Sequence, residues 1–187
     1  GTASGEFKGS GEYLSLADSD DWNFGSGDFT IDCWVRLNSI GQSYLVDQFA
    51  DVNNYIRFDR NNGNQLHFAA RSGGVTKAQF YTPWSPNTGQ WYHIAIVRNN
   101  SIQYLFIDGV SQTLTVLVAF DSNPLPDVSS PLYIAASQQE SGSMLSGYLD
   151  ELRISKGIAR WTSNFTSPSA PYETDTTSHT VSSTSPA

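Results

Sequence analysis

Residues 147–155 read GYLDELRIS, and this stretch carries more information about the fold than any other in the chain. Apolar and polar residues alternate along it, as they do in a β-strand whose two faces meet different surroundings. The alternation places Asp150 on the same side as Tyr148, Leu152 and Ile154. An unpaired buried charge is strongly destabilising. We therefore expect Asp150 to have a partner, and a bound cation is one candidate.

The composition indicates one folded, strand-rich domain. The chain has 187 residues, of which 13% are aromatic and only 15% are charged, which suits a full core better than disorder. Its net charge of −8 argues against nucleic-acid partners and anionic membranes. No apolar run approaches the ~20 residues that span a bilayer, so we expect no membrane insertion. A single cysteine, Cys33, excludes an intramolecular disulfide.

Short strand patterns separated by turn-forming residues run along most of the chain. The expected strands are residues 12–17, 29–36, 43–50, 54–60, 65–72, 76–82, 90–99, 101–107, 110–112, 131–137 and 147–155. The dipeptide 108–109, Asp-Gly, indicates a hairpin, because a type I′ turn needs positive φ at both central residues. The strand at 90–99 is apolar on both sides, so we expect both to be covered. Residues 156–161 are expected to form one helical turn capped by Ser155.

This pattern predicts an all-β, two-sheet antiparallel sandwich. We expect the domain to span residues 1–172, followed by a tail at residues 173–187 in which nine of fifteen residues are Ser or Thr. Such a tail buries too little apolar surface to fold alone and is typical of a disordered segment or a linker. Docking on a neighbouring subunit or a coat of glycans are the alternatives.

Four stretches resemble laminin-G-like domains of the concanavalin A-like lectin/glucanase superfamily. They are GDFTIDCWV at 27–35, WYHIAIVR at 91–98, LFIDG at 105–109 and YLDELRI at 148–154. They occur in the family's order and cover about residues 6–172, and SKGIARWTSNFT at 155–166 is similar to a variant frequent in phage tail and microbial surface proteins. The resemblance implies a jelly roll of two curved sheets, one of them concave and often carbohydrate-binding.

The resemblance also implies a structural Ca²⁺ ion. In it, Asp150 joins backbone carbonyls from near the start of the domain, and the candidate regions are residues 7–9 and 25–28, which include Asp28. Calcium takes roughly six to eight oxygen ligands. The alternative is that Asp150 accepts hydrogen bonds from the backbone or from Arg or Tyr without a metal. The acidic run at 18–21 lacks the glycine and distal glutamate of an EF-hand and is expected to be a solvated turn.

No catalytic array is visible in the sequence, so we expect a protein that is not an enzyme. Glycosidases on related sandwiches place two or three acids on one strand face, whereas Asp47 and Asp51 lack an alternating partner. Phosphate-binding loops, nucleophile elbows, zinc spacings and dinucleotide fingerprints are absent. We expect His93 to be a packed, hydrogen-bonded core residue and Cys33 to be a core residue rather than a nucleophile.

Sugar binding has the best physical case among ligand functions. Aromatic rings stack on the apolar faces of sugars, while amide, carboxylate and guanidinium groups hydrogen-bond the hydroxyls. The middle of the chain is rich in such groups, and the candidate carbohydrate-binding residues are Tyr44, Asp47, Gln48, Asn53, Asn54, Tyr55, Arg57, Arg71 and Trp84. Trp84 lies in a turn-rich loop, which makes it a candidate for exposure. The alternative for each aromatic residue is that it fills the sandwich or seals its rim.

The sequence therefore favours a non-catalytic carbohydrate-binding or adhesion module that is extracellular or lies on a cell or virion surface, with a glycan or glycoprotein as partner. The alternative is a structural subunit of a filament, fibre or capsid decoration, in which the tail docks on another copy of the chain. Asn99 and Asn164 begin N-glycosylation sequons, which matter only in a host that glycosylates secreted proteins.

Overall fold

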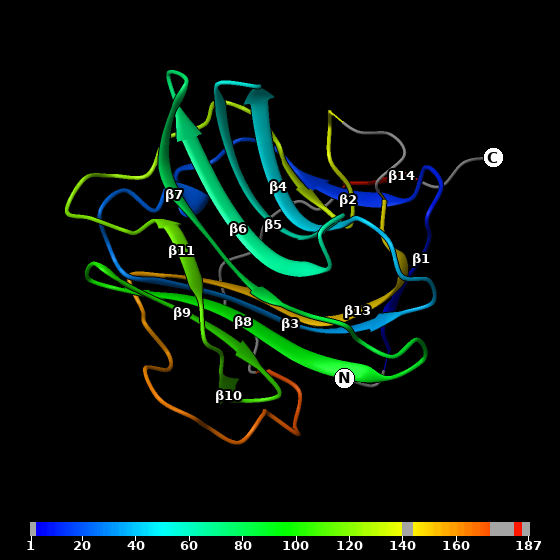
Figure 1. Ribbon diagram of the computed structural model, residues 1–187. Helices are drawn as coiled ribbons and strands as arrows, with labels where there is room; N and C mark the ends of the chain where they lie inside the picture. The colour runs from blue at the N-terminus through cyan, green and yellow to red at the C-terminus, as the bar shows by residue number, and fades with distance from the viewer. Residues whose placement is uncertain (1–2, 140–143, 173–181, 185–187) are drawn as a thin grey trace.

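A computed structural model describes residues 3–139, 144–172 and 182–184, and its ribbon is drawn in Figure 1. In this part of the chain, fourteen β-strands form two antiparallel sheets that pack face to face. The predicted all-β jelly-roll sandwich is therefore confirmed. The one helical element among the described residues is a 3₁₀ turn, Asp20–Trp22, which Ser19 caps at its N-terminus. None of the described helical residues could form a membrane span.

The first sheet contains six strands in the order β1-β13-β3-β8-β9-β10. Their bounds are Gly5–Lys8 for β1, Ser146–Lys156 for β13, Phe29–Leu37 for β3, Trp91–Asn99 for β8, Ile102–Ile107 for β9 and Val110–Ser111 for β10. The predicted hairpin joins β9 to β10, with φ of 49° at Asp108 and 76° at Gly109. Both values are positive, as a type I′ turn requires.

The second sheet contains eight strands in the order β11-β7-β6-β5-β4-β12-β2-β14. Their bounds are Thr115–Val118 for β11, Val75–Pro83 for β7, Gln65–Ser72 for β6, Asn54–Asn61 for β5, Ser43–Asp51 for β4, Leu132–Ile134 for β12, Tyr13–Leu16 for β2 and Ser182–Thr184 for β14. Figure 1 shows β4, β5 and β6 bending away from the six-stranded sheet, so the outer face of this sheet is concave.

The structure contains three strands that the sequence pattern did not predict, namely β1, β11 and β14. Strand β14 belongs to the tail and pairs antiparallel with β2 of the same chain. The other tail residues, 173–181 and 185–187, lie outside the described residues. All three are edge strands of only three or four residues, and an alternating pattern is hard to recognise over so short a stretch.

The core lies between the two sheets and is built from alternate residues of facing strands. Phe29 and Cys33 of β3 and Phe68 of β6 belong to it and are essentially inaccessible to solvent, as expected for Cys33. Trp84 is also in this core, with 5% of its surface exposed and its ring perpendicular to that of Tyr92 at 5.7 Å. The suggestion that Trp84 is exposed is therefore wrong: its loop turns the indole inward, where the burial of apolar surface stabilises the fold.

A β-bulge interrupts the central motif strand. In the register of β13 with β3, Asp150 pairs with Trp34, but the next pair joins Arg153 to Asp32. Two residues of β13 therefore lie opposite one residue of β3, which defines a bulge. Glu151 has a φ of 52° at this point, in the left-handed region that non-glycine residues seldom occupy.

The bulge reverses the alternation of β13, so the prediction for Asp150 is wrong. Before the bulge Leu149 belongs to the core, and after it Leu152 and Ile154 pack against the core. Tyr148 and Asp150 consequently point away from the core, on the outer face of the six-stranded sheet. Asp150 is half-buried there. A strict period of two cannot reveal this change, because one extra residue exchanges the faces of all residues that follow.

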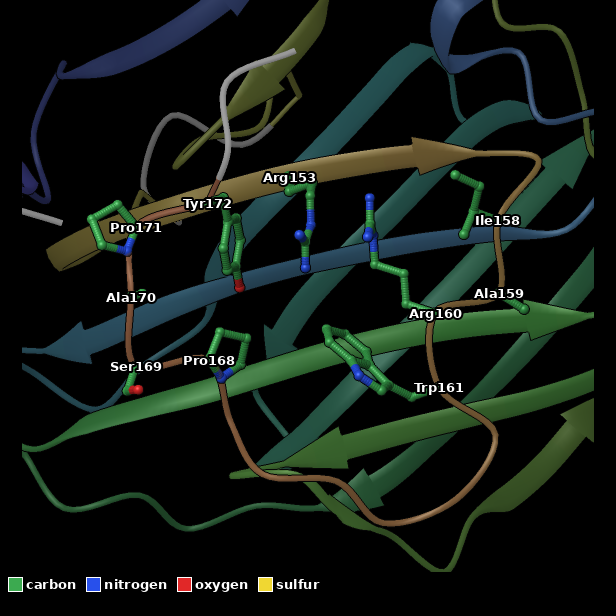
Figure 2. A pocket seen from close by; sticks show the side chains of 10 residues that line it. All are labelled: Arg153, Ile158, Ala159, Arg160, Trp161, Pro168, Ser169, Ala170, Pro171 and Tyr172. Carbon is green, nitrogen blue, oxygen red and sulfur yellow. The ribbon is translucent and has the colours of Figure 1, made fainter.

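Residues 157–172, here called the strap, leave β13 and cross the outer face of the six-stranded sheet (Figure 2). Trp161 and Phe165 of the strap pack against Ala95 and Val97 of β8. Strand β8 is thus covered on both sides, as its two apolar faces predict. The expected helical turn at 156–161 does not form, because β13 continues to Lys156 and the chain then turns at Gly157.

Candidate functional site

A row of side chains crosses the concave outer face of the eight-stranded sheet. In the strand register, Tyr133 pairs with Asp47, Asp47 with Arg57, Arg57 with Ala69, and Ala69 with Gln79. The neighbours of these residues along each strand are buried, and most of them belong to the core, such as Phe58 beside Arg57. Because successive side chains of a strand point to opposite faces, the whole row faces outward.

Arg57 is the centre of this face. Its guanidinium carbon lies 4.2 Å from the ring centre of Tyr55, 5.2 Å from that of Tyr44 and 5.6 Å from that of Phe49. The Nε atom of Arg57 is 3.4 Å from Oδ1 of Asp47, whose side chain is fully buried. Aromatic rings attract a cation placed over their faces, and a buried carboxylate needs a compensating charge. Three rings and one ion pair therefore fix the Arg57 side chain.

A second polar group lies beside Arg57 on the same face. Asp59 pairs with His67, and Oδ1 of Asp59 is 2.8 Å from Nδ1 of His67. On the other side of the imidazole, Nε2 of Gln79 lies 3.4 Å from Nε2 of His67. Tyr81 is the register partner of His67 and is half-buried. These residues extend the polar and aromatic surface across β5, β6 and β7.

Four of the nine predicted carbohydrate-binding residues meet at this face: Tyr44, Asp47, Tyr55 and Arg57. Sequence reasoning missed the other residues of the face, which are Tyr13, Asp59, His67, Gln79, Tyr81 and Tyr133. The rings of Tyr13 and Tyr133 lie 5.1 Å apart. One signal was available in advance, because Asp59 and Tyr55 alternate with Arg57 along the same predicted strand.

The remaining predicted residues support loops instead. Nε2 of Gln48 donates to the carbonyl oxygens of Val128 and Ser130, at 2.6 and 3.0 Å. The Asn53 carbonyl and the Asn54 side chain accept hydrogen bonds from the β6–β7 turn, and Arg71 donates to backbone carbonyls of that turn and of the β4–β5 turn. Their polar atoms satisfy backbone groups that the turns leave unpaired. With the buried Trp84, five predicted residues are thus absent from the concave face.

The two aspartates predicted as calcium ligands, Asp28 and Asp150, are not brought together. Asp150 lies opposite Trp34, six residues along the chain from Asp28, so the two carboxylates are separated by about 20 Å at the rise of a strand. Residues 7–9 begin opposite Gly147 and run away from Asp150. Among residues 3–139, 144–172 and 182–184, no three His, Cys, Asp or Glu side chains are grouped to hold a metal. One ion cannot therefore be shared by Asp28 and Asp150.

A buried polar network fastens the strap to the six-stranded sheet. Nε and Nη2 of Arg153 donate to the two carboxylate oxygens of Asp32, at 3.1 and 2.9 Å. The hydroxyl of Tyr172, at the end of the strap, donates to Asp32 at 2.5 Å and lies 3.0 Å from Nε2 of His93. His93 is fully buried and hydrogen-bonded, as expected.

The network sets the protonation of its members. Burial raises the pKa of Asp32, but hydrogen bonds from His93, Arg153 and Tyr172 outweigh it and leave that pKa below its ordinary value. Burial and the hydrogen bond to Asp32 raise the pKa of Tyr172. The carboxylate is therefore held ionised and the phenol neutral, which are the states that keep the strap in place.

The two predicted glycosylation sites differ in exposure. Asn99 is half-buried at the end of β8. Asn164 is exposed in the strap, and its Oδ1 accepts a hydrogen bond from the Ser111 amide at 2.8 Å. The Asn164 side chain, to which a glycan would be attached, is therefore already engaged in a hydrogen bond.

Residues 8–160 match the family model described as the concanavalin A-like lectin/glucanases superfamily. The chain belongs to this superfamily, which confirms the resemblance seen in the four motifs. A comparison with curated proteins gives no match.

Solved structures show the same fold at low sequence identity. Domain 4 of AbnA, a GH43 extracellular arabinanase from Geobacillus stearothermophilus solved with arabinotriose, has a TM-score of 0.61 and 18% identity, over 83% of this chain and 71% of that one. Domains LG4-5 of the mouse laminin alpha1 chain have a TM-score of 0.54 and 19% identity, over 81% of this chain and 40% of that one. Trypanosoma rangeli sialidase in complex with sialic acid has a TM-score of 0.56 and 14% identity, over 81% of this chain and 25% of that one. The likeness concerns the fold alone.

Proposed function

We propose that this protein is a non-catalytic carbohydrate-binding module whose ligand lies across the concave face, centred on Arg57. The observation that carries the proposal is the row of aromatic and hydrogen-bonding side chains around Arg57 on the outer face of the eight-stranded sheet. Tyr55, Tyr81 and Tyr133 are half-buried and offer ring surface for stacking on a sugar. Such amphipathic rings suit ligands with one apolar and one polar face.

Arg57 also has unused hydrogen-bonding capacity. Its Nη2 atom is buried and makes no hydrogen bond to any residue in the described part of the chain. A buried donor without an acceptor costs about 1–3 kcal/mol. A sugar hydroxyl that enters beside Tyr44 and Tyr55 would supply an acceptor, so binding would be favoured. The ligands of the structural neighbours, arabinotriose and sialic acid, support a saccharide as the ligand class.

Two carboxylates share the concave face, and their surroundings support binding rather than hydrolysis. Asp47 and Asp59 are diagonal neighbours on β4 and β5, with Cα atoms about 7–8 Å apart in this geometry. Inverting glycosidases separate their carboxyl groups by about 6.5–9.5 Å. However, both side chains are buried, and the basic residues Arg57 and His67 engage them. We propose that these aspartates orient their basic partners and do not act on a glycosidic bond.

An extracellular or surface location, with a role in adhesion, belongs to the same proposal. The extracellular arabinanase among the structural neighbours supports it. Self-assembly into a fibre or filament is the second candidate, because edge strand β11 exposes 41% of Val116 and 58% of Leu117. An unpaired edge can add a strand from another chain. Light scattering across a concentration series tests this candidate, and a monomer at every concentration contradicts it.

Glycan-array screening followed by calorimetric titration of the best ligand tests the binding proposal. Arg57→Gln is expected to weaken binding about tenfold or more, the effect of one hydrogen bond to a charged group. Tyr133→Ala keeps the Arg57–Asp47 pair and is expected to weaken binding severalfold. Arg36→Gln, on the other sheet, is the matched control and should bind like the wild type. Folded variants of Arg57 and Tyr133 with unchanged affinity would contradict the proposal.

The same titrated ligand serves as a substrate test. We expect no hydrolysis of it by the wild-type chain over a long incubation, measured by chromatography of the products. Hydrolysis that disappears in Asp47→Asn or Asp59→Asn would replace the binding proposal with an enzymatic one.

A further inference from the structure

The strap borders an open cavity of about 600 Å³ on the outer face of the six-stranded sheet. The strap leaves β13, runs outward over β8 and β9, and returns beside β13 at Tyr172 (Figure 2). The side chains of Arg153, Arg160, Trp161 and Tyr172 point into the space that it borders. The volume lies within the range of about 300–1,000 Å³ that ligand pockets occupy. This cavity is separate from the concave face, because the two lie on different sheets.

The cavity is cationic although the protein is acidic. Its ten lining residues, all in the described part of the chain, include two arginines and no acidic residue. Asp32 lies beneath the cavity and neutralises Arg153 through two hydrogen bonds. Nε of Arg160 donates to the Ser155 hydroxyl at 2.7 Å, and the Arg160 guanidinium forms no ion pair with a described residue. Arg160 therefore lacks an ion-pair partner within the described ranges, with Asp32 as a more distant attracting charge, in a protein of net charge −8.

The position of Arg160 is fixed by its surroundings. Its backbone amide donates to the Thr30 hydroxyl at 3.0 Å, and that hydroxyl donates to the carbonyl oxygen of Ile158 at 2.8 Å. Two bonds to one buried threonine hold this part of the strap on β3. The guanidinium thus extends from an anchored backbone, which lowers the entropy that a ligand must remove on binding.

Aromatic side chains form the walls beside the arginines. The ring of Trp161 is stacked on that of Phe165, with centres 3.9 Å apart and planes within 5° of each other. The guanidinium of Arg153 lies 3.7 Å from the ring centre of Tyr172 and 5.8 Å from that of Trp161. Stacking on both sides holds these groups in fixed orientations. The cavity thus joins the Arg160 guanidinium, which has no ion pair with a described residue, to rigid, partly apolar walls.

We propose that this cavity binds the oxyanion of an acidic saccharide, a carboxylate or sulfate group carried on a sugar ring. The planar fork of a guanidinium matches the two oxygens of such a group and can donate two parallel hydrogen bonds. Arg160 supplies the charge, and the walls at Trp161 and Tyr172 accommodate the ring. Because Asp32 already occupies Arg153, an incoming anion is bound chiefly by Arg160. The protein then has two saccharide sites, one on each sheet.

Calorimetric titration with three oligosaccharides of equal length tests this proposal: an oligogalacturonide, a chondroitin sulfate and a neutral malto-oligosaccharide. The first two arms distinguish carboxylate from sulfate. We expect the wild-type chain to bind at least one acidic oligosaccharide, and Arg160→Gln to weaken that binding about tenfold or more. Arg36→Gln, which removes one charge from the same face outside the cavity, should bind like the wild type. Melting temperatures of both variants verify that they are folded.

Three results would overturn the proposal: no binding of either acidic oligosaccharide, binding that Arg160→Gln leaves unchanged, or equal losses in Arg160→Gln and Arg36→Gln. The last result would show attraction by net charge alone. Arg57→Gln separates this site from the concave face, because it should leave binding of the acidic oligosaccharide intact. Failure of one site can therefore be recognised without reference to the other.

Discussion

Replacing Asp32 with asparagine is expected to destabilise the protein strongly and to loosen the strap. The carboxylate of Asp32 is fully buried and accepts hydrogen bonds from Arg153 and from the Tyr172 hydroxyl. Asparagine has nearly the same shape but lacks the charge, so it leaves the Arg153 guanidinium without its counter-charge. The Asp32→Asn variant therefore measures how much the network contributes to holding residues 157–172 against the sheet.

The structure sets the size of the effect. Removing one partner of a buried ion pair costs about 3–5 kcal/mol. Because 21% of the Arg153 side chain is exposed and water can reach it, we expect the lower end, about 3 kcal/mol. In a domain of this size each kcal/mol lowers the melting temperature by about 2–4 °C. The melting temperature of Asp32→Asn should therefore fall by about 6–12 °C.

Urea unfolding followed by tryptophan fluorescence, with scanning calorimetry, measures both quantities. Asp127→Asn is the matched control, because Asp127 is exposed and the change in charge is the same. If the free energy of unfolding of Asp32→Asn lies within about 1 kcal/mol of that of the control, the network does not hold the strap on the sheet and the reasoning is refuted. The double variant Asp32→Asn/Arg153→Gln should recover part of the loss, since it removes both charges.

Three further predictions concern the pH dependence of Asp32, the turn at Gly109 and the expected calcium site. The pKa of Asp32 is lowered by folding. Its contribution to stability is therefore present above the unfolded pKa of about 4 and is lost as the pH falls through the lower folded pKa. Between about pH 5 and pH 3, the free energy of unfolding in urea should fall more steeply for the wild type than for Asp32→Asn. A Cβ at Gly109, where φ is 76°, would lie 2.0 Å from the carbonyl oxygen of Phe165. Gly109→Ala should therefore lower the free energy of unfolding by about 2 kcal/mol or more and make the strap sensitive to limited proteolysis. A strap as resistant to the protease as that of the wild type would contradict this. Because Asp28 and Asp150 are far apart along the sheet, EDTA is expected to leave the melting temperature unchanged, and a clear drop would show that a calcium site forms after all.

Much of the sandwich could be predicted because the pattern that specifies a strand is local. The alternation of Phe29, Ile31 and Cys33 with more polar neighbours marks the core face of β3, and the structure places these three residues in the core. The two apolar sides of β8 predicted a second cover, which the strap provides. The Asp108-Gly109 turn was predictable because few dipeptides adopt two positive φ values at low cost.

The candidate site was only half predictable, because its members are neighbours across strands rather than along the chain. Arg57 and Tyr55 belong to one predicted strand, and their composition alone suggested sugar binding. His67 joins them only because β5 and β6 pair in one particular register. Trp84 illustrates the reverse case, since its polar, turn-rich neighbours indicated exposure while the tertiary structure buries the ring against Tyr92.

The motif strand at 147–155 contains, within nine residues, features that the sequence predicts and features that it does not. By itself the sequence determined that this stretch is a strand and that it belongs to the concanavalin A-like superfamily, because alternation and motif order are properties of the chain alone. Only the tertiary structure decided where Asp150 points and that Arg153 pairs with Asp32 beneath the strap. The physical reason is the bulge at Glu151, since one extra residue in a paired strand exchanges its two faces. The bulge arises from the pairing of this strand with β3, whose residues lie more than a hundred positions away in the sequence.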